Sequence, residues 1–271
     1  MNCSPHKNNN SFTCYTKNQL VKIANEINKK KKRKVIVMSN KNKKQIWNQI
    51  NKNLFDQCKY EWCWLDTSVI KNIPDDDLHN FTFRPKKPKS WVKNKNTWLT
   101  TTDIDDVMEQ YEKKYDNFKF FGPVPVDCPT GIYCELSNIN LKKMNSDGIK
   151  KLGVIFNLDK HNEPGSHWVA LFSNEDDKSI TYYDSVAHQP PHYIKTFVKL
   201  LTNNYKKNRG INMKFNYNKK KHQFGDSECG IYSINFLVES LKGAKLKDFQ
   251  NKKISDFSMN ILRDYFYRPP E

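Results

Sequence analysis

The chain has 271 residues, 37% hydrophobic and 13% aromatic, a composition that supports one large globular domain or two smaller ones. It contains no run of 18 apolar residues and no apolar N-terminal segment, so the sequence predicts neither a transmembrane helix nor a secretory signal. The net charge is +17; residues 1–95 hold 21 Lys and Arg against 7 Asp and Glu, which leaves 25 against 22 for residues 96–271.

The basic excess therefore belongs to the N-terminal third of the chain. It fits a surface for nucleic acid or an acidic partner, and it fits equally well a general abundance of Lys and Asn. The seven cysteines are an odd number at irregular spacing. Without an export signal they predict reduced thiols and not a disulfide framework, in the cytoplasm or the nucleus.

The N-terminal third is expected to be mainly helical. Residues 1–16 are polar and are expected to be poorly ordered. Apolar residues at helical spacing predict one helix from about Thr16 to the basic run at 29–34, and a second over 43–55. A short apolar stretch at 35–38 predicts a strand between them.

Two cysteines follow these helices. Cys58 and Cys63 lie five residues apart without a second matching pair, which is a weak pattern for zinc, and packing thiols are the favoured interpretation. Residues 74–95 are rich in Pro, Asp and Lys and predict a linker. The expected organisation is a basic arm with its linker, residues 1–95, followed by a main domain, residues 96–271, with no metal site.

The main domain is expected to mix strands and helices. A first helix, capped by Thr102 or Asp103, should run to about Tyr115. Strands are expected at 118–126, 153–158, 167–172, 179–185 and 213–217, and further helices at 192–203, from Cys229, and from Ser255 or Asp256. Turn residues at 174–178 join the third and fourth strands in a hairpin. The predicted fold class is α+β, with a central, mostly antiparallel sheet flanked by helices.

Cys229 carries the first chemical feature. It starts an apolar helical pattern, with Asp226 or Ser227 as the expected N-cap, and the free N–H groups of a first helical turn favour a thiolate. Gln223, six residues upstream, has an amide that could donate to an oxyanion. The parts suit a cysteine acyl-transfer enzyme. A small buried cysteine that begins a core helix is the alternative.

A thiolate nucleophile needs a base and a group that orients the base. His167 stands at the start of a predicted strand, and Asp184 lies near the end of the strand that returns from the hairpin. The hairpin register should bring them close, so that the carboxylate holds the imidazole tautomer. Taken singly, each residue also fits an ordinary strand end, and Trp168 fits a core position as well as a substrate wall.

Four residues in this order match a known family. The forms Ser-His-Trp-Val-Ala, Tyr-Tyr-Asp-Ser and Gln-(x5)-Cys-Gly resemble the superfamily of SUMO-specific proteases and the adenovirus proteinase. The Phe-Phe-Gly-Pro-Val-Pro-Val-Asp segment and the Lys-rich arm with paired cysteines resemble its viral branch, which includes the polyprotein-processing protease of African swine fever virus. The resemblance covers residues 97–241 well and the arm weakly.

The resemblance implies a papain-like cysteine protease fold of the adenain type and a role for each residue. Cys229 would be the nucleophile, His167 the general base and acid, and Asp184 the group that orients His167. Gln223, with the backbone N–H of Cys229, would form the oxyanion hole, and Trp168 would line a narrow groove for a Gly-Gly-like tail. Two positions depart from the pattern of relatives: Glu228 replaces the usual Asp of cellular enzymes, and Asp184 replaces the Asn of the swine fever virus protein.

The expected function is a cysteine endopeptidase without a cofactor that cleaves after Gly-Gly-type sites, as a viral maturation protease on structural polyproteins. One alternative is a deconjugating protease for SUMO or another ubiquitin-like protein. An alternative of another class is a nucleic-acid-binding virion protein with a relic protease domain. The expected partners are a protein substrate and, through the basic arm, nucleic acid, but no membrane. The expected location is the virion or host cytoplasm for a viral protein, and otherwise the cytoplasm or nucleus, without secretion.

Overall fold

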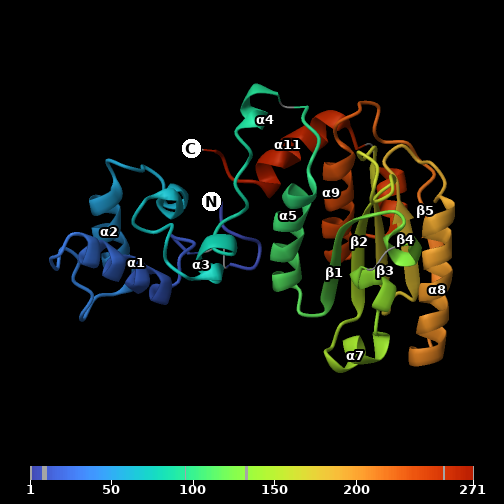
Figure 1. Ribbon diagram of the computed structural model, residues 1–271, viewed down its shortest axis with the longest axis horizontal. Coiled ribbons are helices and arrows are strands. Elements are labelled where there is room, and N and C mark those ends of the chain that lie inside the picture. The colour runs from blue at the N-terminus through green and yellow to red at the C-terminus, as the bar shows by residue number, and fades with distance from the viewer. Residues whose placement is uncertain (1, 8–10, 95, 132–133, 253, 271) are drawn as a thin grey trace. The chain divides into compact units, whose positions relative to one another are not determined.

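The computed structural model describes residues 2–7, 11–94, 96–131, 134–252 and 254–270 (Figure 1). The chain divides into two compact units, Met1–Lys87 with Tyr267–Glu271, and Pro88–Phe266. The first unit contains α1 (Lys17–Lys30), α2 (Lys43–Leu54), the 3₁₀ helix η1 (Glu61–Asp66) and α3 (Asp76–Asn80). The second unit contains the helices α4 (Ser90–Lys93), α5 (Thr101–Lys114), α6 (Cys128–Gly131), η2 (Glu135–Asn138), α7 (Leu141–Ser146), α8 (His192–Arg209), α9 (Cys229–Leu241), α10 (Leu246–Asn251) and α11 (Asp256–Phe266), and the strands β1 (Phe118–Pro125), β2 (Lys151–Asn157), β3 (Trp168–Asn174), β4 (Ser179–Tyr183) and β5 (Lys214–Tyr217).

The five strands form one sheet in the order β1-β2-β3-β4-β5. The central pairs, β2 with β3 and β3 with β4, are antiparallel, whereas the outer pairs, β1 with β2 and β4 with β5, are parallel. Parallel neighbours need a long crossover, and each outer pair has one: α6, η2 and α7 join β1 to β2, and α8 joins β4 to β5. The α+β class is confirmed, with an antiparallel centre and parallel edges.

Helices cover both faces of the sheet, with α8 on one side and α5 and α9 on the other (Figure 1). Side chains alternate along β2: Val154 and Phe156 join the core on the α8 side, where the Phe156 and Phe197 ring centroids lie 5.9 Å apart. Gly153 faces the opposite side, where a Cβ atom would lie 2.8 Å from Phe118 Cζ and 3.3 Å from Leu237 Cδ1. The glycine therefore permits close packing of α9 on the sheet.

The cap of α5 lies two residues before the first predicted position. Thr100 is the N-cap; its side chain accepts from the backbone N–H of Asp103, whose carboxylate accepts from the backbone N–H of Thr100. The predicted cap at Thr102 or Asp103 is therefore wrong, because Asp103 is the third helical residue of a capping box. The N-cap directly follows Leu99, a residue that contacts Trp168 in the candidate active site.

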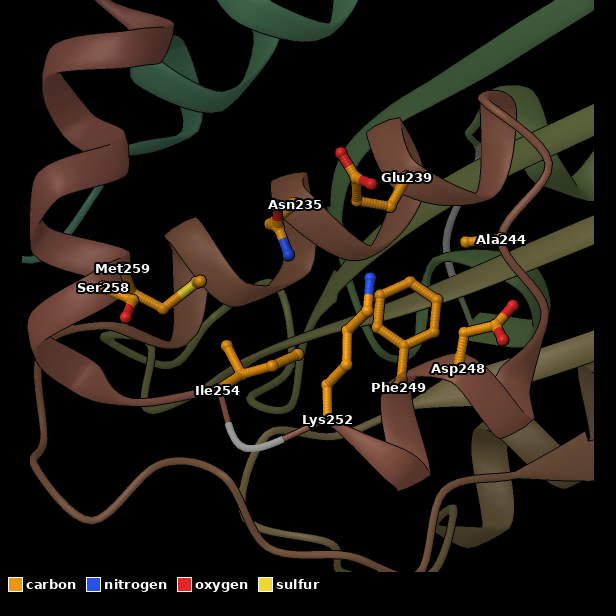
Figure 2. Close-up of a pocket in the computed structure, with 9 residues that line it drawn as sticks. All are labelled: Asn235, Glu239, Ala244, Asp248, Phe249, Lys252, Ile254, Ser258 and Met259. Carbon is orange, nitrogen blue, oxygen red and sulfur yellow. The ribbon is translucent and has the colours of Figure 1, made fainter.

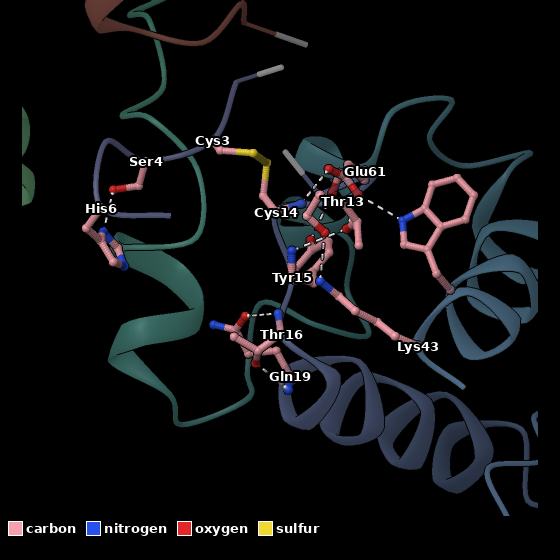
Figure 3. Close-up of a disulfide and its surroundings, with 12 residues drawn as sticks. Cys3, Ser4, His6, Thr13, Cys14, Tyr15, Thr16, Gln19, Lys43 and Glu61 are labelled. Carbon is pink, nitrogen blue, oxygen red and sulfur yellow. Dashed lines mark hydrogen bonds between the residues drawn. A yellow bond between two sulfur atoms is a disulfide. The ribbon is translucent and has the colours of Figure 1, made fainter. Parts of the chain in front are cut away.

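The first unit has its own apolar core, which extends to the N-terminus. Tyr15 is fully buried and stacks on Trp64, with ring centroids 5.5 Å apart. Figure 3 shows the Cys3–Cys14 disulfide beside Glu61, whose carboxylate accepts hydrogen bonds from the side chain of Thr13 and the backbone of Cys14. The expectation of a poorly ordered 1–16 segment is therefore wrong for its described residues; residues 1 and 8–10 lie outside them.

Six of the seven cysteines are paired, so the prediction of reduced thiols is wrong for all but one. The pairs are Cys3–Cys14, Cys58–Cys63 and Cys128–Cys134, with Cα atoms 5.3, 5.9 and 5.7 Å apart. The odd number and irregular spacing of the cysteines led to the wrong prediction. Each disulfide closes a short local loop, and the seventh cysteine, Cys229, is unpaired. Since Cys58 and Cys63 bond to each other, they are not free zinc ligands.

Two further predictions for the first unit are wrong. Residues 35–38 form no strand, because the Asn28 side chain accepts from the backbone N–H groups of Val35 and Ile36 and takes the place of a strand partner. Residues 74–95 are more than a linker: Leu78 and Phe83 are buried in the core of the first unit, and α3 and α4 lie within this stretch. Lys95 lies outside the described residues.

Candidate active site

Cys229 occupies the first turn of α9 and is buried, with 1% of its surface exposed. The N-cap is Glu228, so the predicted caps at Asp226 and Ser227 are wrong. The Ser227 hydroxyl donates to the Glu228 carboxylate at 2.7 Å and is not placed as a helix cap. The Glu228 side chain does not cap the helix, and Cys229 is the first residue of α9, at the positive end of the helix dipole.

His167 and Asp184 meet as the hairpin predicted. His167 Nε2 lies 2.7 Å from Asp184 Oδ1. The observed register pairs Ala170 with Tyr183, which by continuation sets position 184 opposite 169. His167 is therefore the diagonal neighbour of Asp184 and not its direct partner.

Asp184 is fully buried and is held from several directions. Its carboxylate accepts from the backbone N–H of Val186 at 3.0 Å and of His188 at 3.1 Å. The Asn218 side chain accepts from the backbone N–H of Asp184 at 2.8 Å and donates to its carbonyl at 2.7 Å. These bonds fix the carboxylate that orients the imidazole. Asn218 was not predicted as a site residue, and its one sequence signal is its place directly after β5.

Burial lowers the pKa of His167, but hydrogen bonds with Asp184 and Cys229, and the charge of both residues, outweigh it and raise this pKa to about 9. Because Asp184 takes Nε2, Nδ1 is the ring nitrogen available to the thiol. A protonated imidazole beside the sulfur stabilises a thiolate. The structure thus brings a base, its orienting acid and a thiol into one cluster.

Gln223 is buried and its amide is fixed at both atoms. Oε1 accepts from the Ser185 hydroxyl at 2.6 Å, and Nε2 donates to the Gly225 carbonyl at 2.9 Å. An amide nitrogen carries two hydrogens, so the bond to Gly225 leaves one for a ligand. The backbone N–H of Gln223 also donates to the Ser185 carbonyl at 3.0 Å. Ser185, directly after Asp184, therefore links the two predicted site residues, a link that spacing alone did not show.

Trp168 directly follows His167 and lies beside Leu99 and Gly230. Its Nε1 donates to the Leu99 carbonyl at 3.0 Å, and a Cβ on Gly230 would lie 3.0 Å from Leu99 Cβ and 3.4 Å from Trp168 Cδ1. Trp168 also lines a cavity of about 600 Å³. The other residues around this cavity are Trp98, Leu99, Thr100, Thr101, Pro123, Val124, Pro125, Asn157, Asp159, Lys160, His161, Glu163, Pro164 and Gly165. A glycine directly after Cys229 thus lets the helix approach the groove wall closely.

Within the described ranges, His, Cys, Asp and Glu side chains form no group of three or more able to hold a metal ion. The same part of the chain contains no helix with the length and apolar character that crossing a bilayer requires.

Comparison with known proteins identifies the family. Residues 96–269 match the Ulp1 protease family, C-terminal catalytic domain. Protein R355 of Acanthamoeba polyphaga mimivirus, named as a thiol protease, is 36% identical over 200 residues, which cover 74% of this chain and 65% of that protein. The cysteine protease S273R of African swine fever virus (isolate Tick/Malawi/Lil 20-1/1983) is 23% identical over 250 residues, which cover 85% of this chain and 90% of that protein.

The fold agrees with a solved structure. A crystal structure of the African swine fever virus pS273R protease superposes with a TM-score of 0.67 at 19% sequence identity, covering 99% of this chain and 96% of that one. The family match spans the sheet, the cluster around Cys229 and the groove beside Trp168. The chain therefore belongs to the Ulp1 protease family and is, by that membership, a cysteine peptidase.

Proposed function

We propose that this chain is an endopeptidase in which Cys229 attacks the scissile carbonyl. The observation that carries the proposal is the contact of His167 with both Asp184 and Cys229, at the start of α9 and next to Gln223. His167 would hold the thiol proton, deliver it to the leaving amine, and then take a proton from the water that hydrolyses the thioester. Asp184 would keep the imidazole in the required tautomer.

Gln223 and the backbone N–H of Cys229 would stabilise the oxyanion of each tetrahedral intermediate. The Gln223 amide is suited to this role because Ser185 and Gly225 hold it before substrate arrives. A preorganised donor does not have to reorient during the reaction, which is the source of its catalytic value.

The proposed substrate is a protein with a Gly-Gly-type site, and the proposed role is maturation of structural polyproteins of a virus. The viral relatives support the setting, and Trp168, held against Leu99, supports a narrow groove that favours small residues. Residues 96–271 would be the catalytic domain. Residues 1–95 would be a basic arm that contacts nucleic acid, supported by their 21 Lys and Arg against 7 Asp and Glu.

Removal of a ubiquitin-like modifier is the second candidate, because a swine fever virus relative that is 22% identical bears the name SUMO-1 cysteine protease. The experiment that separates the two compares cleavage of an unstructured peptide with a Gly-Gly site, the same peptide with Ala-Ala, and a SUMO precursor. Polyprotein processing predicts cleavage of the Gly-Gly peptide at a rate close to that of the SUMO precursor. A strong preference for the folded SUMO precursor would favour deconjugation.

The matched controls for that experiment are Cys229→Ala and His167→Ala, each of which should abolish turnover without unfolding the chain. Near-full activity in either variant would show that the catalytic roles are wrongly assigned. Lack of turnover by the wild type, together with nucleic-acid binding by the arm, would favour the relic-protease alternative.

A further inference from the structure

Helix α11 meets the loop between Gln223 and Cys229 along one stripe. The residues that reach the loop are Asp256, Asn260 and Arg263, spaced by four and three positions, so they share one face of the helix. The stripe faces the loop that carries one proposed oxyanion donor and leads into the helix that carries the other.

Asp256 binds the first half of the loop. Its Oδ2 atom accepts from the backbone N–H of Phe224 at 3.0 Å and of Gly225 at 2.8 Å. Its Oδ1 atom accepts from the Tyr232 hydroxyl of α9 at 3.0 Å, and that hydroxyl also lies 3.1 Å from the His222 carbonyl. One carboxylate thus ties the residues after Gln223 to α9.

The same stripe binds the second half of the loop. Asn260 Nδ2 donates to Glu228 Oε1 at 3.0 Å, and Arg263 Nη2 donates to the Ser227 carbonyl at 3.1 Å. The Arg263 guanidinium carbon also lies 4.8 Å from the centre of the Trp91 ring. These contacts fix the two residues immediately before Cys229.

A pocket lies beside the contact between α11 and α9. A pocket of about 340 Å³ opens between α9, α10 and α11, and Figure 2 shows Met259 and Ile254 beside it with Asn235 of α9 across from them.

We propose that Asp256 is a positioning residue for the oxyanion hole. The path is short: Asp256 holds the N–H of Gly225, and the carbonyl of Gly225 accepts from Gln223 Nε2. Loss of the Asp256 contacts would free the backbone on the N-terminal side of Gly225, so that the Gly225 carbonyl could move and take the Gln223 amide with it. The C-terminal helix is then part of the catalytic apparatus, although it supplies no atom to the substrate. This inference rests on the peptidase function proposed above.

The test uses Asp256→Asn in the full chain, because the amide has one acceptor atom and cannot accept from both the loop backbone and the Tyr232 hydroxyl. Hydrolysis of a fluorogenic Gly-Gly peptide amide should show kcat lowered roughly 10-fold to 100-fold, less than complete loss of a donor, with KM unchanged. The rate of Cys229 alkylation by iodoacetamide should stay the same, because attack on a saturated carbon forms no oxyanion. Asp116→Asn, the same change at an exposed position two residues after the C-terminal end of α5, is the control and should alter neither rate.

A double variant separates positioning from general damage. In a Gln223→Ala background, Asp256→Asn should lower kcat no further, because the donor that it positions is gone. Tyr232→Phe removes one hydroxyl, should act in the same direction more weakly, and takes over the test if Asp256→Asn does not fold. A fall in alkylation rate equal to the fall in kcat, an additive effect with Gln223→Ala, or unchanged kcat would each overturn the proposal. Alkylation without any hydrolysis by the wild type would instead overturn the proposed function, and this inference with it.

Discussion

The proposed mechanism depends on the protonation state of the His167 imidazole. Its pKa, raised to about 9, means that the folded chain keeps the imidazole protonated between pH 6.5 and about 9, where an ordinary histidine is neutral. Because Cys229 contributes to this shift by a hydrogen bond and by charge, Cys229→Ala should lower the pKa of His167. An NMR pH titration of labelled histidine measures it, with the other histidines as internal reference. An unchanged pKa would show that the two side chains do not interact.

The side-chain amide of Gln223 is the second group whose loss should change the rate. Gln223→Ala removes one proposed oxyanion donor and should lower kcat by about 10²–10³, as the loss of such a donor does in other enzymes. Steady-state hydrolysis of a Gly-Gly peptide measures the effect. Ser185→Ala, which frees Gln223 Oε1 but leaves Nε2 bound to Gly225, should cost less. Equal activity of Gln223→Ala and wild type would remove Gln223 from the mechanism.

The predicted site residues lie close together in the fold, whereas the side chains that support them carry no signal in the sequence. Cys229 was marked by a helix start, and His167 and Asp184 by hairpin register, which are local patterns. Asn218 and Asp256 come close to the site only when the chain folds. Asn218 binds Asp184, which lies 34 positions away in the sequence, and Asp256 binds Gly225, which lies 31 positions away. No periodicity or spacing carries that information.

Among the helices and strands, the close contact between the sheet and α9 at Gly153 allows a test of the packing. Gly153→Ala would set a Cβ 2.8 Å from a buried ring atom of Phe118, so it should destabilise the chain by about 1–3 kcal/mol through overpacking. Urea denaturation measures the change. The cost should shrink in a Phe118→Leu background, which removes the ring; an equal cost there would mean that the strain has another origin.

Helices were predicted well where an apolar stripe recurs, as in α1 and α9, because burial of that stripe dominates their stability. The wrong predictions of the strand at 35–38 and of the start of α5 share a physical cause. In both places a side chain forms hydrogen bonds with the backbone, and these bonds set the local structure. Asn28 takes the N–H groups of Val35 and Ile36, and the Thr100–Asp103 capping box moves the start of α5. Such local bonds compete with periodicity and leave little trace in it.

For the whole molecule, the excess of positive charge in residues 1–95 supports the proposal that the arm binds nucleic acid. If the arm binds nucleic acid, the logarithm of Kd should rise linearly with the logarithm of salt concentration, with a slope of about 0.9 per phosphate contacted. Replacing the exposed residues Lys32, Arg33 and Lys34 by Gln should reduce that slope, measured by fluorescence anisotropy. The same change at Lys142, Lys143 and Lys207 of the second unit is the control. A flat salt response would leave only a compositional origin for the charge.

Cys229 is proposed as a working nucleophile, and because its thiol is unpaired, this proposal can be tested directly. Intact-mass spectrometry after incubation with a Gly-Gly peptide vinyl sulfone, without reductant, should show one adduct on the wild type and none on Cys229→Ala, since the other six cysteines are paired. Adduct formation at another cysteine, or no adduct on a folded wild-type chain, would show that Cys229 is not a working nucleophile.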